Sequence, residues 1–315
     1  MCTTFVCSAQ PLSTQQLHEA LKINATESKD VFEKHVKTLS SNHDVDAKLT
    51  FLKGLGFYRN QELAKALDLF SKAIDLDQTF ALPLLARATI FAANNDIEKA
   101  IDDLSTVINI DSGNMQAIDL RIKYFLKSGK YQKALIDADL KLKLQPNNVQ
   151  NYVLCSKICK ELNSFSKSEQ YFVKALAIPS INLVAVNIAF AQHLMTIEKY
   201  KDAIFRFKTA EKINQNALQA VDYNNLSVAF MKTNNLDEAH YYANKALLAE
   251  PKNIDFKTNL ASILLAKKDW KSASAQANEI LFLNPENIDA QNILVFIEKN
   301  SGTKAVNNTY SLLTK

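Results

Sequence analysis

Hydrophobic and polar positions alternate along residues 220–253 in a way that predicts two amphipathic helices joined by a polar turn. Small side chains interrupt the hydrophobic positions at fixed places of this 34-residue unit, with Ser227 eighth, Ala239 twentieth and Ala246 twenty-seventh. Small residues at such places let two helices pack closely. Pro251 ends the second helix because it lacks an N–H group and clashes with the preceding turn.

The same unit occurs seven times, beginning at residues 47, 81, 115, 149, 184, 220 and 254, and we number its places 1 to 34. Place 20 is small in every unit. It holds Ala66, Ala100, Ala134, Ser168, Ala203, Ala239 and Ala273. Lys141 is the misfit in the column of place 27, which otherwise holds Ala, Val or Ile. The fixed interval predicts that the units stack on one another.

These units resemble tetratricopeptide repeats, which carry small residues at places 8, 20 and 27, large hydrophobic ones at 11 and 24, and proline at 32. The resemblance implies an all-α, right-handed α-solenoid of stacked helix–turn–helix repeats, in which each repeat contacts only its neighbours. It also implies that the first helices of the repeats line a concave groove that holds an extended or helical peptide.

The pattern divides the chain into three parts. We expect N-terminal capping helices and a flexible start in residues 1–46, seven repeats in 47–287, and a C-terminal capping helix and tail in 288–315. Caps cover the hydrophobic edges that the terminal repeats of a solenoid leave exposed. The alternative is that the N-terminal helices dock a partner.

Composition adds limits to this interpretation. Five glycines and six prolines in 315 residues favour helices over strands joined by tight turns. A net charge of +4 is too small to predict nucleic acid as the main partner. Neither a secretory leader nor a hydrophobic stretch of the ~18 residues that a membrane span needs is visible, so we expect a cytoplasmic protein.

No set of residues with the spacing of a catalytic or cofactor site is present, so we expect no enzyme activity, cofactor or metal. Cys155 and Cys159 share one face of a predicted helix, but two further metal ligands are missing nearby. We interpret them as buried thiols that pack like small hydrophobic residues. His193 stands next to a packing position and is interpreted as structural.

Side-chain amides form the first candidate binding set. Place 6 is asparagine in the last two repeats, Asn225 and Asn259, with Asn224 beside the first and Gln192 at place 9 of the fifth repeat. An amide both donates and accepts, so a row of them can hydrogen-bond a peptide backbone of any sequence. This is similar to asparagine ladders in peptide-binding members of the family. The alternative is that Asn225 only satisfies a neighbouring turn.

Lysines form the second candidate set, at places 9, 12 and 13 of the third and fourth repeats. They are Lys123, Lys127, Lys157 and Lys160. Neighbouring repeats stack ~10 Å apart, so these ammonium groups are expected to form one positive strip that attracts an acidic peptide. The alternative is that they are merely solvated.

We therefore predict a non-enzymatic scaffold or adaptor that binds a protein or peptide in its groove. The alternative is a homo-oligomeric assembly subunit that associates through its terminal helices. The residues do not specify which partner is bound.

Overall fold

The computed structural model describes residues 10–43, 45–179 and 183–301. Every regular element in these ranges is an α-helix, and neighbouring helices stack in antiparallel pairs, which confirms the predicted all-α solenoid class. The predicted flexible start and C-terminal tail fall largely in residues 1–9 and 302–315, outside the described ranges.

The helices of the predicted repeats alternate between a first helix of 13 or 14 residues and a second of 12 or 14. The bounds of the described helices, including α1, α2 and α17 outside the repeats, are α1 (Thr14–Thr26), α2 (Lys29–Asn42), α3 (Ala47–Arg59), α4 (Leu63–Leu76), α5 (Ala81–Ala93), α6 (Ile97–Ile110), α7 (Met115–Lys127), α8 (Tyr131–Leu144), α9 (Val149–Glu161), α10 (Phe165–Leu176), α11 (Leu183–Thr196), α12 (Tyr200–Ile213), α13 (Ala220–Lys232), α14 (Leu236–Ala249), α15 (Ile254–Ala266), α16 (Trp270–Leu283) and α17 (Ile288–Ser301).

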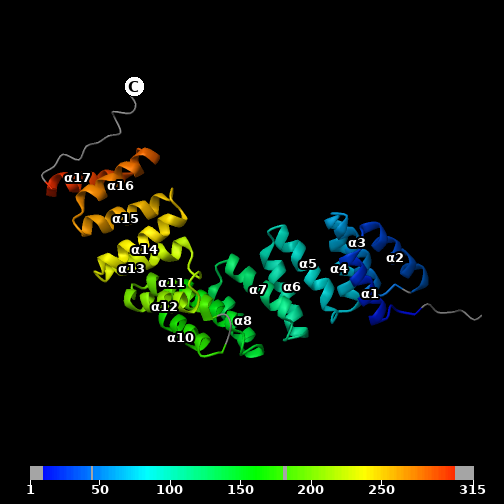
Figure 1. The fold of residues 1–315 in the computed structure, drawn as a ribbon. Helices are drawn as coiled ribbons and strands as arrows, with labels where there is room; N and C mark the ends of the chain where they lie inside the picture. The colour runs from blue at the N-terminus through cyan, green and yellow to red at the C-terminus, as the bar shows by residue number, and fades with distance from the viewer. Residues whose placement is uncertain (1–9, 44, 180–182, 302–315) are drawn as a thin grey trace, which may run out of the picture. The chain divides into compact units, whose positions relative to one another are not determined.

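Contacts group these helices into two compact units, residues 1–146 and 147–315, which we describe separately. Consecutive helices pack on each other within each unit (Figure 1). In the second unit, α9, α11, α13, α15 and α17 also contact one another in turn, so the first helices of its repeats form a continuous row. The division at 46 and 287 expected from the sequence remains a prediction.

The turn between the two helices of each pair has one geometry throughout. Place 15 adopts a left-handed backbone conformation in all seven pairs, with φ between 53° and 68°. The residues are Gln61, Asn95, Gly129, Asn163, Glu198, Asn234 and Lys268. Glycine and asparagine adopt this conformation most readily. The shared φ shows that the seven pairs are copies of one backbone unit.

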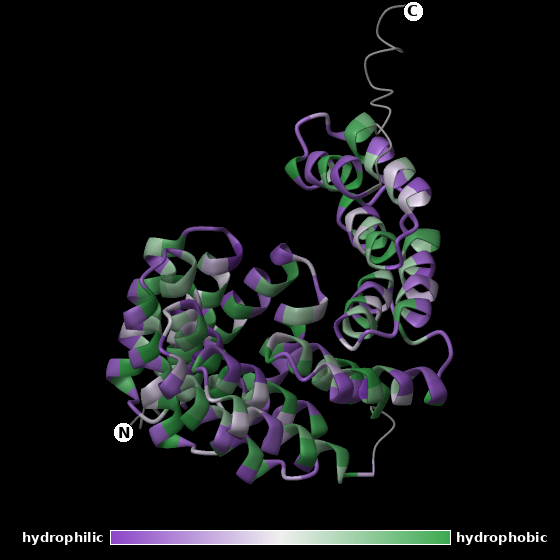
Figure 2. Cartoon of the chain, turned by 90° about the vertical axis from the view of Figure 1, so that its left-hand side faces the viewer, coloured by the Kyte–Doolittle hydropathy of each residue, from purple (hydrophilic) through white to green (hydrophobic). Residues whose placement is uncertain are grey.

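The small residues of place 20 are all fully buried where the two helices of a pair meet. At place 8 of the first repeat, a β-carbon added to Gly54 would lie 2.6 Å from the ring of Phe70 on α4. Only glycine permits that approach of α3 to α4. Helices of both units carry hydrophobic and hydrophilic residues on different sides (Figure 2), as the amphipathic pattern predicts.

Lys141, the misfit at place 27, has its charge paired. Its ammonium group forms an ion pair with the exposed carboxylate of Asp119 on α7, and its side chain is 16% exposed. The long aliphatic part of a lysine can pack as a hydrophobic group while its end reaches the surface. The third repeat therefore keeps the fold despite the substitution.

Polar contacts join neighbouring repeats in the first unit. Arg121 of α7 donates two hydrogen bonds of 2.7 Å to Asp137 of α8 and a third of 3.0 Å to Ser105 of the preceding repeat. The same contacts occur one repeat earlier between Arg87, Asp103 and Ser71. The arginines stand at place 7, the aspartates at place 23 and the serines at place 25 of the previous repeat.

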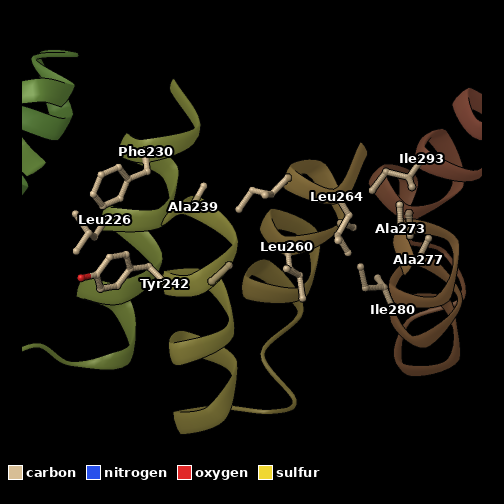
Figure 3. Close-up of a cluster of buried hydrophobic side chains, with 14 of the residues drawn as sticks. Leu226, Phe230, Ala239, Tyr242, Leu260, Leu264, Ala273, Ala277, Ile280 and Ile293 are labelled. Atoms are coloured by element: carbon tan, nitrogen blue, oxygen red, sulfur yellow. The ribbon is translucent and has the colours of Figure 1, made fainter. Parts of the chain in front are cut away.

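The second unit joins its fifth and sixth repeats differently. Tyr242, at place 23, donates its hydroxyl proton to Glu211 (2.9 Å) and accepts a hydrogen bond from Lys208 (2.6 Å). Its ring stacks on that of Phe230, with centroids 5.6 Å apart, as Figure 3 shows for these two side chains. Lys245 completes the cluster with an ion pair of 3.1 Å to Glu211.

Candidate functional site

A hollow of about 470 Å³ opens along the row of first helices in the second unit. Its lining comes from α9, α10, α11 and α13, and so from three successive repeats. The lining residues are Ser156, Lys157, Lys160, Phe172, Ala189, Gln192, His193, Met195, Thr196, Val221 and Asn225. Four of the eight residues predicted from the sequence are brought together here.

Two cations border this hollow. Lys157 is exposed and Lys160 half-buried on α9, and neither ammonium group has an ion pair within the described residues. No carboxylate belongs to the lining. The hollow is therefore a positively charged place with a partly hydrophobic wall formed by residues such as Met195 and Val221.

The two amides of the hollow have different surroundings. The Gln192 side chain donates a hydrogen bond of 2.7 Å to Asp222, which is buried and also accepts from the backbone N–H of Gln219 at 3.1 Å. This bond orients the Gln192 side chain. Asn225 is half-buried, and its side chain has no hydrogen bond within the part of the chain that the structure describes. Its donor and acceptor both remain available to a ligand.

His193 lies in the lining with only 4% of its surface exposed. Its Nδ1 lies 3.4 Å from the hydroxyl of Ser168, which itself donates to the Ser156 carbonyl oxygen at 2.9 Å. This network favours the neutral tautomer with its proton on Nδ1, and Nε2 is buried with no hydrogen-bond partner in the described part of the chain. Burial lowers the pKa of His193, and the positive charges of Lys160 and Lys199 act in the same direction, against Glu169.

The predicted amides have two different kinds of surroundings. Asn259 of α15 donates to the Asn224 side chain at 2.9 Å and to the Ser227 hydroxyl at 2.5 Å. These bonds link α15 to α13, so Asn224 and Asn259 are engaged with each other, whereas Asn225 lines the hollow with Gln192. Ligand binding by any of these residues remains a prediction.

Lys123 and Lys127 belong to the first unit, on α7, whereas Lys157 and Lys160 belong to the second. Both lysines of α7 are exposed, and Lys127 donates a long hydrogen bond of 3.3 Å to Asn95 of the preceding repeat. The continuous positive strip across the third and fourth repeats therefore stays a prediction.

The sequence did not identify His193 or the hydrophobic wall as parts of this site. One signal was present: place 10 holds isoleucine in three other repeats but histidine here. A polar residue in a column of buried hydrophobic ones indicates a local difference in packing, and the hollow lies at that point.

Two further observations concern other kinds of site. Among the described residues, no three His, Cys, Asp or Glu side chains are grouped so that they could hold a metal ion. Cys155 and Cys159 are both fully buried on α9. No helix in the described ranges has the length and hydrophobicity required to cross a membrane.

Comparison with known proteins bears on the family. Residues 230–294 match the model of the tetratricopeptide repeat. No curated protein sequence is significantly similar to this chain. The C-terminal part of a repeat protein from Cytophaga hutchinsonii has a TM-score of 0.63 at 17% identity and covers 78% of this chain and 99% of its own.

Two further solved structures share the fold. The structure of Naa15/Naa10 bound to HypK-THB has a TM-score of 0.58 at 15% identity, covering 88% of this chain and 43% of that one. A tetratricopeptide repeat protein from Parabacteroides merdae has a TM-score of 0.50 at 14% identity, covering 80% and 98%. Residues 230–294 thus match the tetratricopeptide repeat model, and the described helix pairs with their shared turn have the fold of a tetratricopeptide repeat solenoid.

Proposed function

We propose that this protein is a non-enzymatic scaffold that binds a segment of a partner protein along the first helices of its second unit. The observation that carries the proposal is the hollow, where two lysines and an amide that have no side-chain partner among the described residues lie beside a hydrophobic wall. The tetratricopeptide fold supports a role in protein–protein interaction. We place this function in the cytoplasm, as the sequence leads us to expect.

Each group of the hollow suits a different part of such a segment. Asn225 can donate to a backbone carbonyl and accept from a backbone N–H, which gives affinity independent of sequence. Lys157 and Lys160 favour an acidic side chain near that point. Met195 and Val221 offer hydrophobic contact for a neighbouring residue. The preferred ligand is therefore an extended segment that contains both acidic and hydrophobic residues.

Asn224 and Asn259 have a supporting role in this proposal. Their mutual hydrogen bond joins two first helices of the row, which keeps the wall beside the hollow in place. A pre-ordered wall loses less conformational freedom when a ligand binds.

A selection from a random library of displayed 12-residue peptides tests the proposal, with the full chain as target. We expect the Asn225→Ala, Lys157→Ala double variant to bind the selected acidic peptides about tenfold more weakly, because a hydrogen bond to backbone and a charge contact are lost. Its melting temperature should stay within a degree or two of wild type.

Asn259→Ala is the matched control. Since Asn259 bonds within the fold, this change should lower the melting temperature and leave peptide affinity nearly unchanged in the folded protein. Equal binding of all selected peptides by wild type and by the double variant would contradict the proposal.

A homo-oligomeric assembly subunit is the second candidate. The observation that favours it is α17, the terminal helix of the described residues, whose Ile288, Val295 and Phe296 side chains are about half or more exposed. Light scattering over a range of concentrations distinguishes the two: a dimer that Val295→Glu dissociates supports assembly, and a monomer at all concentrations excludes it.

A further inference from the structure

The first unit contains a hollow of its own, of about 360 Å³, between α2 and α3. It is lined by Phe32, Glu33, Val36, Lys37, Ser40, Lys53, Gly56, Phe57 and Asn60. The hollow lies on a different unit from the site proposed above and shares no residue with it.

Gly56 is the reason that space exists here. It stands at place 10 of the first repeat, a place that is buried in each of the other six. There the residues are Ile90, Tyr124, Ile158, His193, Ala229 and Ile263, none more than 6% exposed. A β-carbon added to Gly56 would meet no atom within 4 Å. The hollow is therefore the place of a side chain that the other repeats possess and this repeat lacks.

The preceding helix does not fill this place. Aligned from their first residues, α2 has Phe32 and Leu39 where α4 has Ala66 and Ala73. Both Phe32 and Leu39 are buried, and Phe32 lines the hollow, but neither fills the space over Gly56.

No local benefit explains a glycine at this position. Glycine in the middle of a helix is less favourable than alanine, because the flexible backbone loses more freedom on folding. Gly54, two residues earlier, is required by the close contact with Phe70, but Gly56 has no such contact. A residue that weakens its helix and preserves a cavity is consistent with a cavity that is used.

The rim of the hollow is positively charged. Lys37 and Lys53 form no ion pair within the described residues. The one carboxylate, that of Glu33, accepts a hydrogen bond of 2.7 Å from the Asn60 amide. The side-chain oxygen of Asn60 is buried and has no partner among the residues that the structure describes, so it can accept one further hydrogen bond.

We propose that this hollow is a second interaction site, which receives one aliphatic side chain from a partner protein. The side chain has the size of leucine or isoleucine, because isoleucine fills the same place in three other repeats. An acidic residue beside it in the partner segment contacts Lys37 or Lys53, and a backbone N–H reaches the free oxygen of Asn60. The hydrophobic interior provides affinity, and the charged rim selects the segment.

Gly56→Ile tests the proposal because it supplies the missing side chain from the protein itself. The probe is a random library of displayed 12-residue peptides selected on the full wild-type chain. We expect a class of peptides with Leu or Ile next to Asp or Glu that bind Gly56→Ile about tenfold more weakly. The same peptides should lose about threefold with Lys53→Ala and nothing with Asn225→Ala, Lys157→Ala.

A second variant covers the case in which isoleucine disturbs folding. Gly56→Ala adds a single carbon into open space and should raise the melting temperature while it weakens the same peptides two- to threefold, by about one CH₂ group's share of the contact. The proposal is overturned if no selected peptide distinguishes wild type from both Gly56 variants, or if those that do carry no acidic residue. A dimer of the chain that Gly56→Ile abolishes would also overturn it, because the occupant would then be a second copy.

Peptides that lose affinity only with the Asn225→Ala, Lys157→Ala variant would support the function proposed for the second unit and leave this hollow without a ligand. The two proposals can therefore fail separately in one set of measurements.

Discussion

The two units join successive repeats through different polar side chains. In the first, an arginine that pairs with an aspartate of its own repeat also hydrogen-bonds a serine of the preceding repeat, as Arg121 does with Asp137 and Ser105. In the second, Tyr242 occupies the place of the aspartate and binds Lys208 and Glu211 of the preceding repeat. Place 23 thus supplies a polar group to the junction in both units, although its charge differs.

This comparison shows what the repeat geometry requires and what it leaves open. In both units a side chain at place 25 of the preceding repeat is hydrogen-bonded, with Arg121 as its partner in the first unit and Tyr242 in the second. Which side chain forms this bond differs between the units. The two arrangements differ in how much stability a substitution removes. A buried ion pair that loses one partner leaves a charge without solvation, whereas a tyrosine that loses its hydroxyl keeps a hydrophobic ring.

The largest effect is expected for Asp137→Ala in the first unit. The Asp137 side chain is 3% exposed and that of Arg121 is 16% exposed, so the change strands a largely buried guanidinium group. We expect the free energy of unfolding to fall by about 3–5 kcal/mol, measured by urea denaturation. The double variant Arg121→Met, Asp137→Leu should recover most of this loss, and a double variant as unstable as Asp137→Ala would contradict the explanation.

A smaller effect is expected for Tyr242→Phe in the second unit. The ring keeps its stacking on Phe230, and only the hydroxyl that bonds Glu211 and Lys208 is removed. The loss should be about 1 kcal/mol in the same urea experiment. Tyr241→Phe is the control, since the ring of Tyr241 is largely exposed and its hydroxyl should contribute almost nothing to stability. Equal effects of the two changes would mean that the junction has no special role.

The smallest effect is expected from acid, through Glu211 of the second unit. Burial by itself raises the pKa of Glu211, but hydrogen bonds from Lys208, Lys245 and Tyr242 outweigh it and lower the pKa below its ordinary value of 4.5. A lowered pKa means that Glu211 contributes stability above pH 4.5 that is lost as the pH falls through the folded-state pKa.

Thermal melts at pH 6 and below pH 4.5 in wild type and Glu211→Gln measure this contribution. The variant should start less stable and lose less on acidification. A variant with the same acid sensitivity as wild type would show that other carboxylates dominate the acid response. The pH dependence of stability would then not measure the contribution of Glu211.

Much of the fold could be predicted because repetition averages out local exceptions. The column of place 20 is small in every repeat, so one serine or one misfit such as Lys141 did not obscure the interval. The left-handed residue at place 15 could not be inferred in the same way. Gln61, Glu198 and Lys268 are unusual in that conformation, and the geometry of the surrounding helices imposes it.

The sites were harder to predict than the fold. Counting places assigned Asn225 and Asn259 to one row, but it could not show that Asn259 bonds Asn224 while Asn225 remains unengaged. Hydrogen bonds between neighbouring helices depend on side-chain conformations that spacing does not determine. Gly56 could not be identified from the sequence, because its effect depends on the empty space beside it in the fold.

The left-handed turns described above have a practical consequence for protein engineering. Gln61, Glu198 and Lys268 adopt a conformation that disfavours side chains with a β-carbon by about 1 kcal/mol each. These residues lie in turns between helices and do not belong to the lining of either hollow. Glycine or asparagine at the three turns would therefore raise thermal tolerance without altering recognition, and the chain could then serve as a robust framework onto which new binding surfaces are built.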